Sequence, residues 1–216
     1  MWKTVCPNLI RWFLRPISGK RYACSPRALY EAMLADPAYD SWTKVWAFRD
    51  PEKYRFLEKD PHTRVVAWRT ADYYRACAGA GYWITNSRMP RELSCRKDQA
   101  YIQCWHGTPL KKLGYDLEQY AEKNSTLSEV RENYLAEARR VTHMPSPSPF
   151  YTEKMISAFH LGELGKEHVL WEQGYPRNDR LFSAGPGECG RIRKKTGDSG
   201  GEKGDFVCPY LEGQPA

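Results

Sequence analysis

One histidine stands among residues that suit chemistry on a phosphate group. His106 lies in the segment Gln103-Cys-Trp-His-Gly-Thr-Pro-Leu-Lys-Lys-Leu-Gly114. After it come a glycine that allows close backbone approach, a hydroxyl, a proline suited to the first turn of a helix and two cations: Gly107, Thr108, Pro109, Lys111 and Lys112. Because imidazole titrates near neutral pH, it can take a proton from a hydroxyl beside a phosphate. These residues predict either a general base or a loop histidine with only a structural role.

The elements around this loop alternate between strand-like and helix-like segments. We expect strands over residues 42–48, 63–68, 82–85, 100–105, 141–144 and 168–171, and helices over 70–78, 127–140 and 150–159. Such an alternation predicts an α/β fold, with a Rossmann-like parallel sheet and helices on both faces. Ligands of these sheets bind in loops at the carboxyl ends of the strands, and His106 directly follows one strand.

Length and charge narrow the class of protein. The chain has 216 residues, enough for one domain with a tail but not for two full α/β domains. Its aromatic content of 13% excludes intrinsic disorder. Of the net charge of +7, much comes from residues 61–113, which hold nine basic and three acidic side chains. That stretch suits phosphate-bearing ligands, nucleic acid or an anionic membrane, and it also fits a solvated basic face.

The cysteines and the N-terminal segment indicate a cytoplasmic protein. Seven cysteines are scattered without a C-x-x-C pair and no signal peptide is visible, so we expect reduced thiols. Cys95, Cys104 and His106 lack a fourth ligand, and we therefore predict no metal site and no cofactor. No apolar run is long enough to span a bilayer. Residues 1–15 mix apolar and basic side chains, which suits packing on the domain or a membrane interface.

The His106 segment and three other stretches resemble one enzyme family. Gly19-Lys-Arg-Tyr22 with the following residues to Tyr30 is similar to the opening loop and helix of the CDP-glycerol glycerophosphotransferases, the teichoic-acid primases and polymerases of bacterial cell walls. The run Y-W-I-T-N-S-R-M-P before His106 agrees as well. Two later stretches complete the set: Ser146-Pro-Ser-Pro-Phe150 and Gly174-Tyr-Pro-Arg-Asn-Asp-Arg-Leu-Phe182. The resemblance covers residues 18–182; residues 1–17 match poorly, and Cys104 stands where the family usually has threonine.

The resemblance implies a fold and a reaction. The family has a GT-B architecture, in which two Rossmann-like domains face a cleft, and residues 18–182 would be the acceptor-side domain. A hydroxyl of the acceptor attacks the β-phosphorus of CDP-glycerol, or of CDP-ribitol in relatives, and gives a phosphodiester and CMP. The acceptor would be a prenyl-diphosphate-linked saccharide or poly(glycerol phosphate). His106 matches the histidine proposed as the general base for the acceptor hydroxyl.

The resemblance also suggests which other residues meet the substrates. We expect substrate contacts from a group of glycine, hydroxyl and cationic residues: Gly107, Thr108, Lys111, Lys112, Lys20 and Arg27. Arg177, Asn178 and Asp179 stand where the family's chain leaves its first domain, so they would shape the hinge or the cleft. We further expect a peripheral location on the inner face of the plasma membrane, with contact to its anionic surface and none to nucleic acid.

The last stretch differs from the rest of the chain. Residues 183–216 contain eight of the sixteen glycines and no convincing period, as in a linker and tail. Only Arg191-Ile-Arg-Lys-Lys195 resembles the family, at the helix before its second domain. One permitted coding of residues 204–216, shifted by one base, encodes V-I-L-Y-A-P-T-W-R-D, the motif that the resemblance leads us to expect next. We therefore expect an out-of-frame tail in place of the second domain, and a truncated chain that is inactive alone.

Two other functions fit parts of the sequence. The first is a basic nucleic-acid-binding module, in which tryptophan and tyrosine stack on bases and the cations between Arg64 and Lys112 contact phosphates. The second is a module that binds a membrane surface through residues 1–15.

Overall fold

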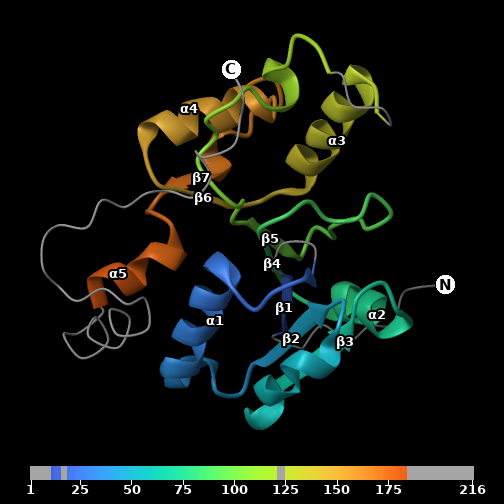
Figure 1. The fold of residues 1–216 in the computed structure, drawn as a ribbon, viewed down its shortest axis with the longest axis vertical. Coiled ribbons are helices and arrows are strands. Elements are labelled where there is room, and N and C mark those ends of the chain that lie inside the picture. Colours follow the sequence, from blue (N-terminus) through green and yellow to red (C-terminus); the bar gives the residue numbers. More distant parts are fainter. Residues whose placement is uncertain (1–10, 16–18, 121–124, 184–216) are drawn as a thin grey trace, which may run out of the picture. The chain divides into compact units, whose positions relative to one another are not determined.

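A computed structural model describes residues 11–15, 19–120 and 125–183 (Figure 1). The strands are β1 (Arg11–Arg15), β2 (Thr43–Phe48), β3 (Thr63–Ala67), β4 (Tyr82–Thr85), β5 (Ala100–Gln103), β6 (Met144–Ser146) and β7 (Leu170–Glu172). The α-helices are α1 (Cys24–Ala35), α2 (Ala71–Gly79), α3 (Leu127–Arg140), α4 (Pro149–Ala158) and α5 (Asp179–Ser183). Short 3-10 helices are η2 (Pro37–Tyr39), η3 (Pro51–Lys59), η4 (Gly114–Asp116), η5 (Glu167–Val169) and η6 (Pro176–Asn178). The chain divides into two compact units, residues 1–179 and 180–216, and every described strand belongs to the first.

Five strands form one parallel sheet in the order β3-β2-β1-β4-β5. β2 and β3 extend the sheet on one side of β1, and β4 and β5 extend it on the other side. The connection from β3 to β4 therefore reverses the direction in which strands are added, and the switch point lies between β1 and β4, as in Rossmann-like folds. β6 and β7 form a parallel pair, and a bridge between Ile102 and His143 connects that pair to the β5 edge. The predicted α/β fold with a parallel sheet is therefore confirmed.

Most of the expected elements also occur where the sequence predicts them. β2, β3, β4 and β5 lie within the four expected strands, and α2 begins and ends within one residue of the expected helix. α3 has the expected bounds, because Thr126 and Glu129 form a capping box at its start and two arginines lie in its last turn. β6 and β7 begin two or three residues later than expected.

The central strand β1 was not expected, and it corrects the interpretation of the N-terminal segment. Phe13 and Leu14 are fully buried, and β1 pairs with β2 on one side and β4 on the other. A membrane-interface role for residues 11–15 is therefore wrong, since these residues lie inside the sheet; residues 1–10 lie outside the described part. The boundary expected at residue 18 falls after this strand. Within the described residues, no helix is both long and apolar enough to cross a membrane.

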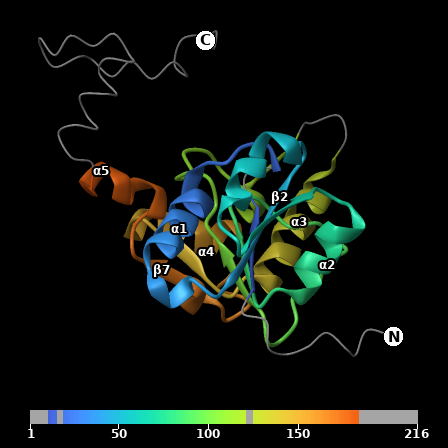
Figure 2. The same cartoon turned by 90° about the horizontal axis from the view of Figure 1, so that it is seen from below.

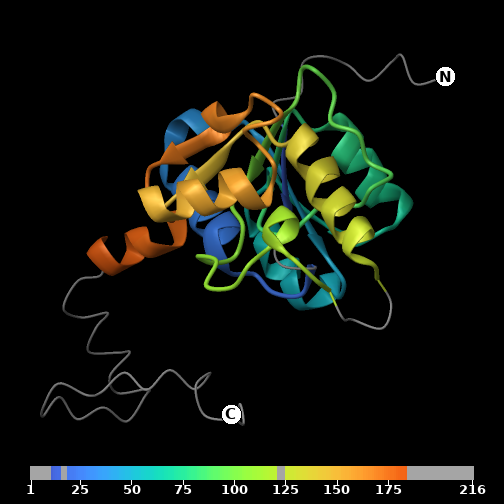
Figure 3. The same cartoon turned by 90° about the horizontal axis from the view of Figure 1, so that it is seen from above.

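Alternate residues of the strands form two separate cores. Side chains on one face pack against α2 and α3, while those on the other face pack against α1 and η3. Figures 2 and 3 show α1 and α2 on opposite sides of the sheet. The first core takes Phe13, Val45, Trp83 and Tyr101 from the strands, and the second takes Leu14, Trp46, Phe48 and Ile84. This alternation fixes the register of the strands, because a slip by one residue would exchange the two faces.

A buried carboxylate connects α3 to the sheet. Glu137 is fully buried, and it accepts hydrogen bonds from the Tyr101 hydroxyl, from Gln103 Nε2 at 2.7 Å and from the Met89 backbone N–H at 3.4 Å. Arg140 forms an ion pair with it at 2.6 Å and also donates to three backbone carbonyls of the β4–β5 connection. Each charge is therefore paired and hydrogen-bonded, which is the condition under which buried charges are tolerated.

Replacing this carboxylate tests the network. We expect Glu137→Gln to lower the free energy of unfolding by about 3 kcal/mol, because the substitution leaves the mostly buried Arg140 without its counter-charge. Glu132→Gln is the matched control on the same helix, where an exposed ion pair with Arg91 should contribute less than about 1 kcal/mol. Urea unfolding followed by tryptophan fluorescence measures both, and equal losses would contradict the prediction.

Candidate functional site

The candidate site lies at the carboxyl edge of the sheet, beside the reversal between β1 and β4. Asn86 directly follows β4, His106 follows β5 by three residues, and Cys24 begins α1 after the connection from β1. Arg177 comes from η6, far away in the sequence, and η6 contacts α1. This edge is where open parallel sheets bind ligands. The expected position of His106 at the end of a strand is confirmed.

The backbone beside His106 is held in an unusual conformation. Trp105 has a φ of +48°, in the left-handed region that bulky residues rarely adopt. Its backbone N–H donates to Gln103 Oε1 at 3.0 Å, and its ring is buried, edge-on to Phe159 at 5.2 Å between centroids. The His106 ring stacks on the Trp105 ring at 4.4 Å, with an interplanar angle of 23°. The turn therefore presents an exposed imidazole on a rigid, buried base.

One guanidinium joins the two loops of the site. Arg177 Nη1 donates to the His106 carbonyl oxygen at 2.9 Å and to Cys24 Sγ at 3.3 Å, and its guanidinium lies over the Tyr175 ring. Arg177, expected at a hinge or cleft, thus lies against the predicted base. Asn178 shows no such contact: its N–H closes a turn on the Tyr175 carbonyl at 2.8 Å.

The charges around His106 favour its neutral form. Partial burial lowers the pKa of His106, and the positive charges of Arg177 and Arg88 lower it further. Since a neutral imidazole has a free nitrogen lone pair at neutral pH, it can accept a proton from a hydroxyl. Burial by itself would raise the pKa of Cys24, but the hydrogen bond from Arg177 and the nearby Asn86 amide and Ser25 backbone outweigh it and lower that pKa.

Sequence reasoning did not identify Cys24, Asn86 or Arg88 as parts of this site. Asn86 and Arg88 lie in the T-N-S-R-M-P stretch, and a polar residue directly after a strand was the signal that could have found Asn86. Cys24 has a φ of +65° at the first residue of α1. Nothing in its sequence neighbourhood indicates a contact with a residue 153 positions away.

No helix begins at Pro109, although proline suits the first turn of a helix. Residues 104–113 are irregular, and only the 3-10 helix η4 follows them. Leu110 of this segment is 91% exposed, while Leu113 packs against the core. Lys111 and Lys112 are consequently exposed on a loop, where they line a groove of about 470 Å³ against α4, and Lys112 forms an ion pair with Glu118.

The other expected substrate residues lie apart from His106 or have protein partners. Thr108 and Tyr175 share a hydrogen bond of 2.9 Å between their hydroxyls, while Gly107 has open space around its Cα. Arg27 forms an ion pair with Glu31 at 2.7 Å on α1. Lys20 is exposed in the β1–α1 connection. Their roles toward a substrate stay predictions.

Metal binding has no support within the described residues. No three histidine, cysteine or acidic side chains among them lie close enough to hold one ion. The described cysteines, Cys24, Cys77, Cys95 and Cys104, are free thiols.

The comparisons with known proteins agree with one another. The family model for CDP-glycerol:poly(glycerophosphate) glycerophosphotransferase matches residues 5–208. A teichoic acid poly(glycerol phosphate) polymerase of Staphylococcus epidermidis is 36% identical over 165 residues, which are 76% of this chain and 22% of that protein. The corresponding polymerase of Bacillus subtilis is 33% identical over 167 residues, 77% of this chain and 21% of that one.

Solved structures give the same result. The structure of the wall teichoic acid polymerase TagF matches with a TM-score of 0.77 and 31% identity, over 90% of this chain and 45% of that one. A variant of TagF soaked with CDPG matches with a TM-score of 0.76 and 30% identity, over 90% and 46%. The chain thus spans less than half the length of these relatives.

The last residue of the His106 segment tests how the loop is anchored. Gly114 has a φ of +51°, and a Cβ there would lie 2.2 Å from the Ala158 carbonyl oxygen and 2.6 Å from the Tyr134 ring. We expect Gly114→Ala to lower the free energy of unfolding by about 3 kcal/mol, through strain and steric overlap. Gly81→Ala, with open space at its Cβ, is the control and should change stability by less than about 1 kcal/mol. A tolerated Gly114→Ala in urea unfolding would contradict this geometry.

Titration of His106 tests the electrostatics of the site. Arg177→Gln removes a nearby positive charge, so protonation of the imidazole becomes easier and the pKa of His106 should rise. Histidine ring protons followed by NMR over a pH series measure the change. Arg64→Gln, at an exposed position on β3, is the control and should leave that pKa unchanged. An unchanged or lower pKa in Arg177→Gln would refute the assigned cause.

Proposed function

The chain belongs to the CDP-glycerol:poly(glycerophosphate) glycerophosphotransferase family, and we propose that it supplies the acceptor side of an enzyme that extends teichoic acid. The donor would be CDP-glycerol, and the acceptor would be the growing poly(glycerol phosphate) or a prenyl-diphosphate-linked saccharide. The names of the polymerases that it resembles, and the CDPG soaked into TagF, support these substrates. CDP-ribitol is the alternative donor.

The single observation that carries this proposal is His106, an imidazole whose surroundings lower its pKa, in the segment that identifies the family. Its imidazole would take the proton from the acceptor hydroxyl as that oxygen attacks the β-phosphorus of the donor. The new P–O bond forms on the acceptor, the bond between the β-phosphorus and the CMP oxygen breaks, and CMP leaves. Because partial burial and the charges of Arg177 and Arg88 lower the pKa of His106, the unprotonated base is favoured at neutral pH.

The nearby residues would bind the phosphates. The open backbone at Gly107 and the cation of Lys111 lie in the same loop as His106, and we assign them to the phosphates of the substrates. Lys20 and Arg27 have weaker support, since Arg27 already has Glu31 as a partner. Arg177 would shape the cleft, because it joins the His106 loop to the start of α1.

We place the domain of residues 11–179 as one half of a GT-B architecture. The chain matches less than half of TagF, so the donor half would correspond to the part of the relatives that this chain does not match. A prenyl-linked acceptor is held in a membrane, which would place the enzyme on the inner face of the plasma membrane. The nucleic-acid alternative has less support, since three of the described tryptophans, Trp46, Trp83 and Trp105, are buried and cannot stack on bases.

Release of CMP from CDP-glycerol tests the proposal. We expect negligible release by this chain alone, because both halves of a cleft are needed to hold the reactants in line. Release should appear when the chain is fused to the part of TagF that it does not match. In that fusion, His106→Asn should lower the rate by about 10²-fold to 10⁴-fold.

The control for this experiment is a histidine at the opposite edge of the sheet. His62 is exposed and directly precedes β3, so His62→Asn should leave the rate within about twofold of the unaltered fusion. Equal rates for His106→Asn and His62→Asn would refute the role of His106 as a base.

A further inference from the structure

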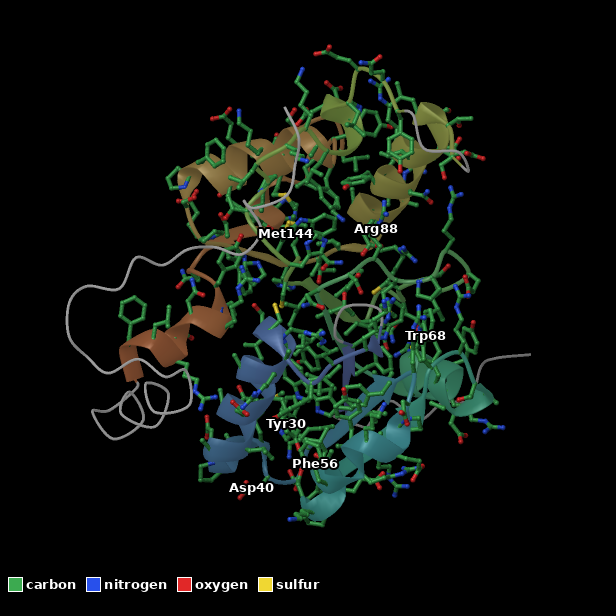
Figure 4. All side chains as sticks on the ribbon, viewed as in Figure 1. Tyr30, Asp40, Phe56, Trp68, Arg88 and Met144 are labelled. Atoms are coloured by element: carbon green, nitrogen blue, oxygen red, sulfur yellow. The ribbon has the colours of Figure 1, made fainter. Side chains whose placement is uncertain are left out.

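A second group of cations lies at the same edge of the sheet. A pocket of about 270 Å³ is lined by five arginines, Arg15, Arg69, Arg88, Arg91 and Arg140, together with Trp68, Met89, Pro90 and Asn133 (Figure 4 labels Trp68 and Arg88). Arg15 is the last residue of β1, Arg69 follows β3 and Arg88 follows β4. Three strands thus bring residues from separate parts of the chain to one place.

The most buried of these cations has no carboxylate within ion-pair distance in the described part of the chain. Arg15 is only 4% exposed, and it donates through Nη1 to the Arg88 carbonyl oxygen at 2.7 Å and to Met89 Sδ at 3.6 Å. Its Nε is buried without a hydrogen-bond partner. A buried guanidinium with no anion is costly, so this position favours a ligand that brings negative charge.

Two arginines of the pocket form ion pairs: Arg140 with Glu137, and Arg91 with Glu132. Two others, Arg69 and Arg88, have no carboxylate within ion-pair distance among the described residues. Arg69 lies over the Trp68 ring at 4.8 Å, and Arg88 lies over the Tyr134 ring at 4.9 Å. Glu92 lies beyond ion-pair distance of Arg69 but near enough for that positive charge to contribute to the lowered pKa of Glu92.

The backbone conformation at Arg69 is a further feature of the pocket. Arg69 has a φ of +61°, and the next residue, Thr70, caps α2 by accepting the Tyr73 N–H. A left-handed conformation at a residue with a long side chain costs about 1 kcal/mol or more. Here it occurs at the residue that lines the edge of the pocket, directly after Trp68.

We propose that this pocket binds a phosphate group. Arg15, Arg69 and Arg88 supply three guanidiniums whose paired N–H donors match the oxygens of phosphate, and a phosphate brings the negative charge that Arg15 lacks. Two sources share this chemistry: inorganic phosphate, and the phosphodiester of a glycerol phosphate unit. The proposal does not rest on the transfer reaction at His106, which uses none of these arginines as a binding group.

Arg88 connects the pocket to the candidate site. Its positive charge lowers the pKa of His106, so a phosphate bound at Arg88 should offset that effect and raise the pKa. Occupancy of the pocket therefore has a second readout, the NMR titration of His106, besides the binding itself.

Calorimetric titration of the full chain at constant ionic strength tests the proposal, with inorganic phosphate and glycerophosphoglycerol as separate probes. We expect saturable binding of at least one probe. Arg15→Met and Arg88→Gln should each raise the dissociation constant at least about tenfold, because each removes one guanidinium. Arg75→Gln is the matched control, since Arg75 is exposed and paired with Asp72 on α2, and it should leave the constant unchanged.

The outcomes separate the possibilities. Tighter binding of glycerophosphoglycerol supports the pocket as a site for a polymer phosphate, and tighter binding of inorganic phosphate supports it as a site for the free anion. Absence of saturable binding, or an equal loss in Arg75→Gln, overturns the proposal. Arg88→Gln keeps the test valid if Arg15→Met fails to fold, because Arg88 is exposed. Absence of CMP release by the TagF fusion, with intact phosphate binding by the chain, would refute the transferase and leave this pocket standing.

Discussion

The position of the candidate base, His106, depends on the hydrogen bonds that the buried carboxylate of Glu137 accepts. Its Oε1 accepts from Gln103 Nε2, which orients the Gln103 amide so that Oε1 of that side chain faces the Trp105 N–H. That hydrogen bond supports the left-handed backbone at Trp105, and the Trp105 ring in turn supports the His106 ring. A charge inside the core thus reaches a surface imidazole through two hydrogen bonds and one stacked pair.

The helices and strands that could be predicted from the sequence are those marked by a local pattern of residue types. The capping box of Thr126 and Glu129 determines the start of α3, and runs of β-branched and aromatic residues mark β2, β3 and β4. β1 was not predicted because its five residues, with arginine at both ends, show no alternation of apolar and polar side chains. Only its pairing with β2 and β4 makes this segment a strand. The contact between Arg177 and Cys24 was equally hidden, since it joins residues 153 positions apart.

The neighbours of each arginine in the fold also determine whether its positive charge is compensated or available to bind an anion. Within the basic stretch of residues 61–113, Arg75 and Arg96 pair with Asp72 and Asp98, so their charges are compensated locally. Arg69 and Arg88 belong to the same stretch and have no such partner among the described residues. A count along the sequence treats all four alike. The fold separates surface ion pairs from cations that are gathered at the carboxyl edge of a parallel sheet.

That gathering serves two requirements that otherwise oppose each other. A base that works at neutral pH must lose its proton easily, and a site for phosphates must be strongly positive. In the proposed function Arg88 and Arg177 would satisfy both, because the positive field that would attract an anion adds to the effect of burial in lowering the pKa of His106. The two requirements are coupled, because each bound phosphate would weaken the positive field at the His106 imidazole. A site of this kind therefore needs more positive charge than the anion alone would neutralise, and in the proposed pocket the buried guanidinium of Arg15 would supply that additional charge.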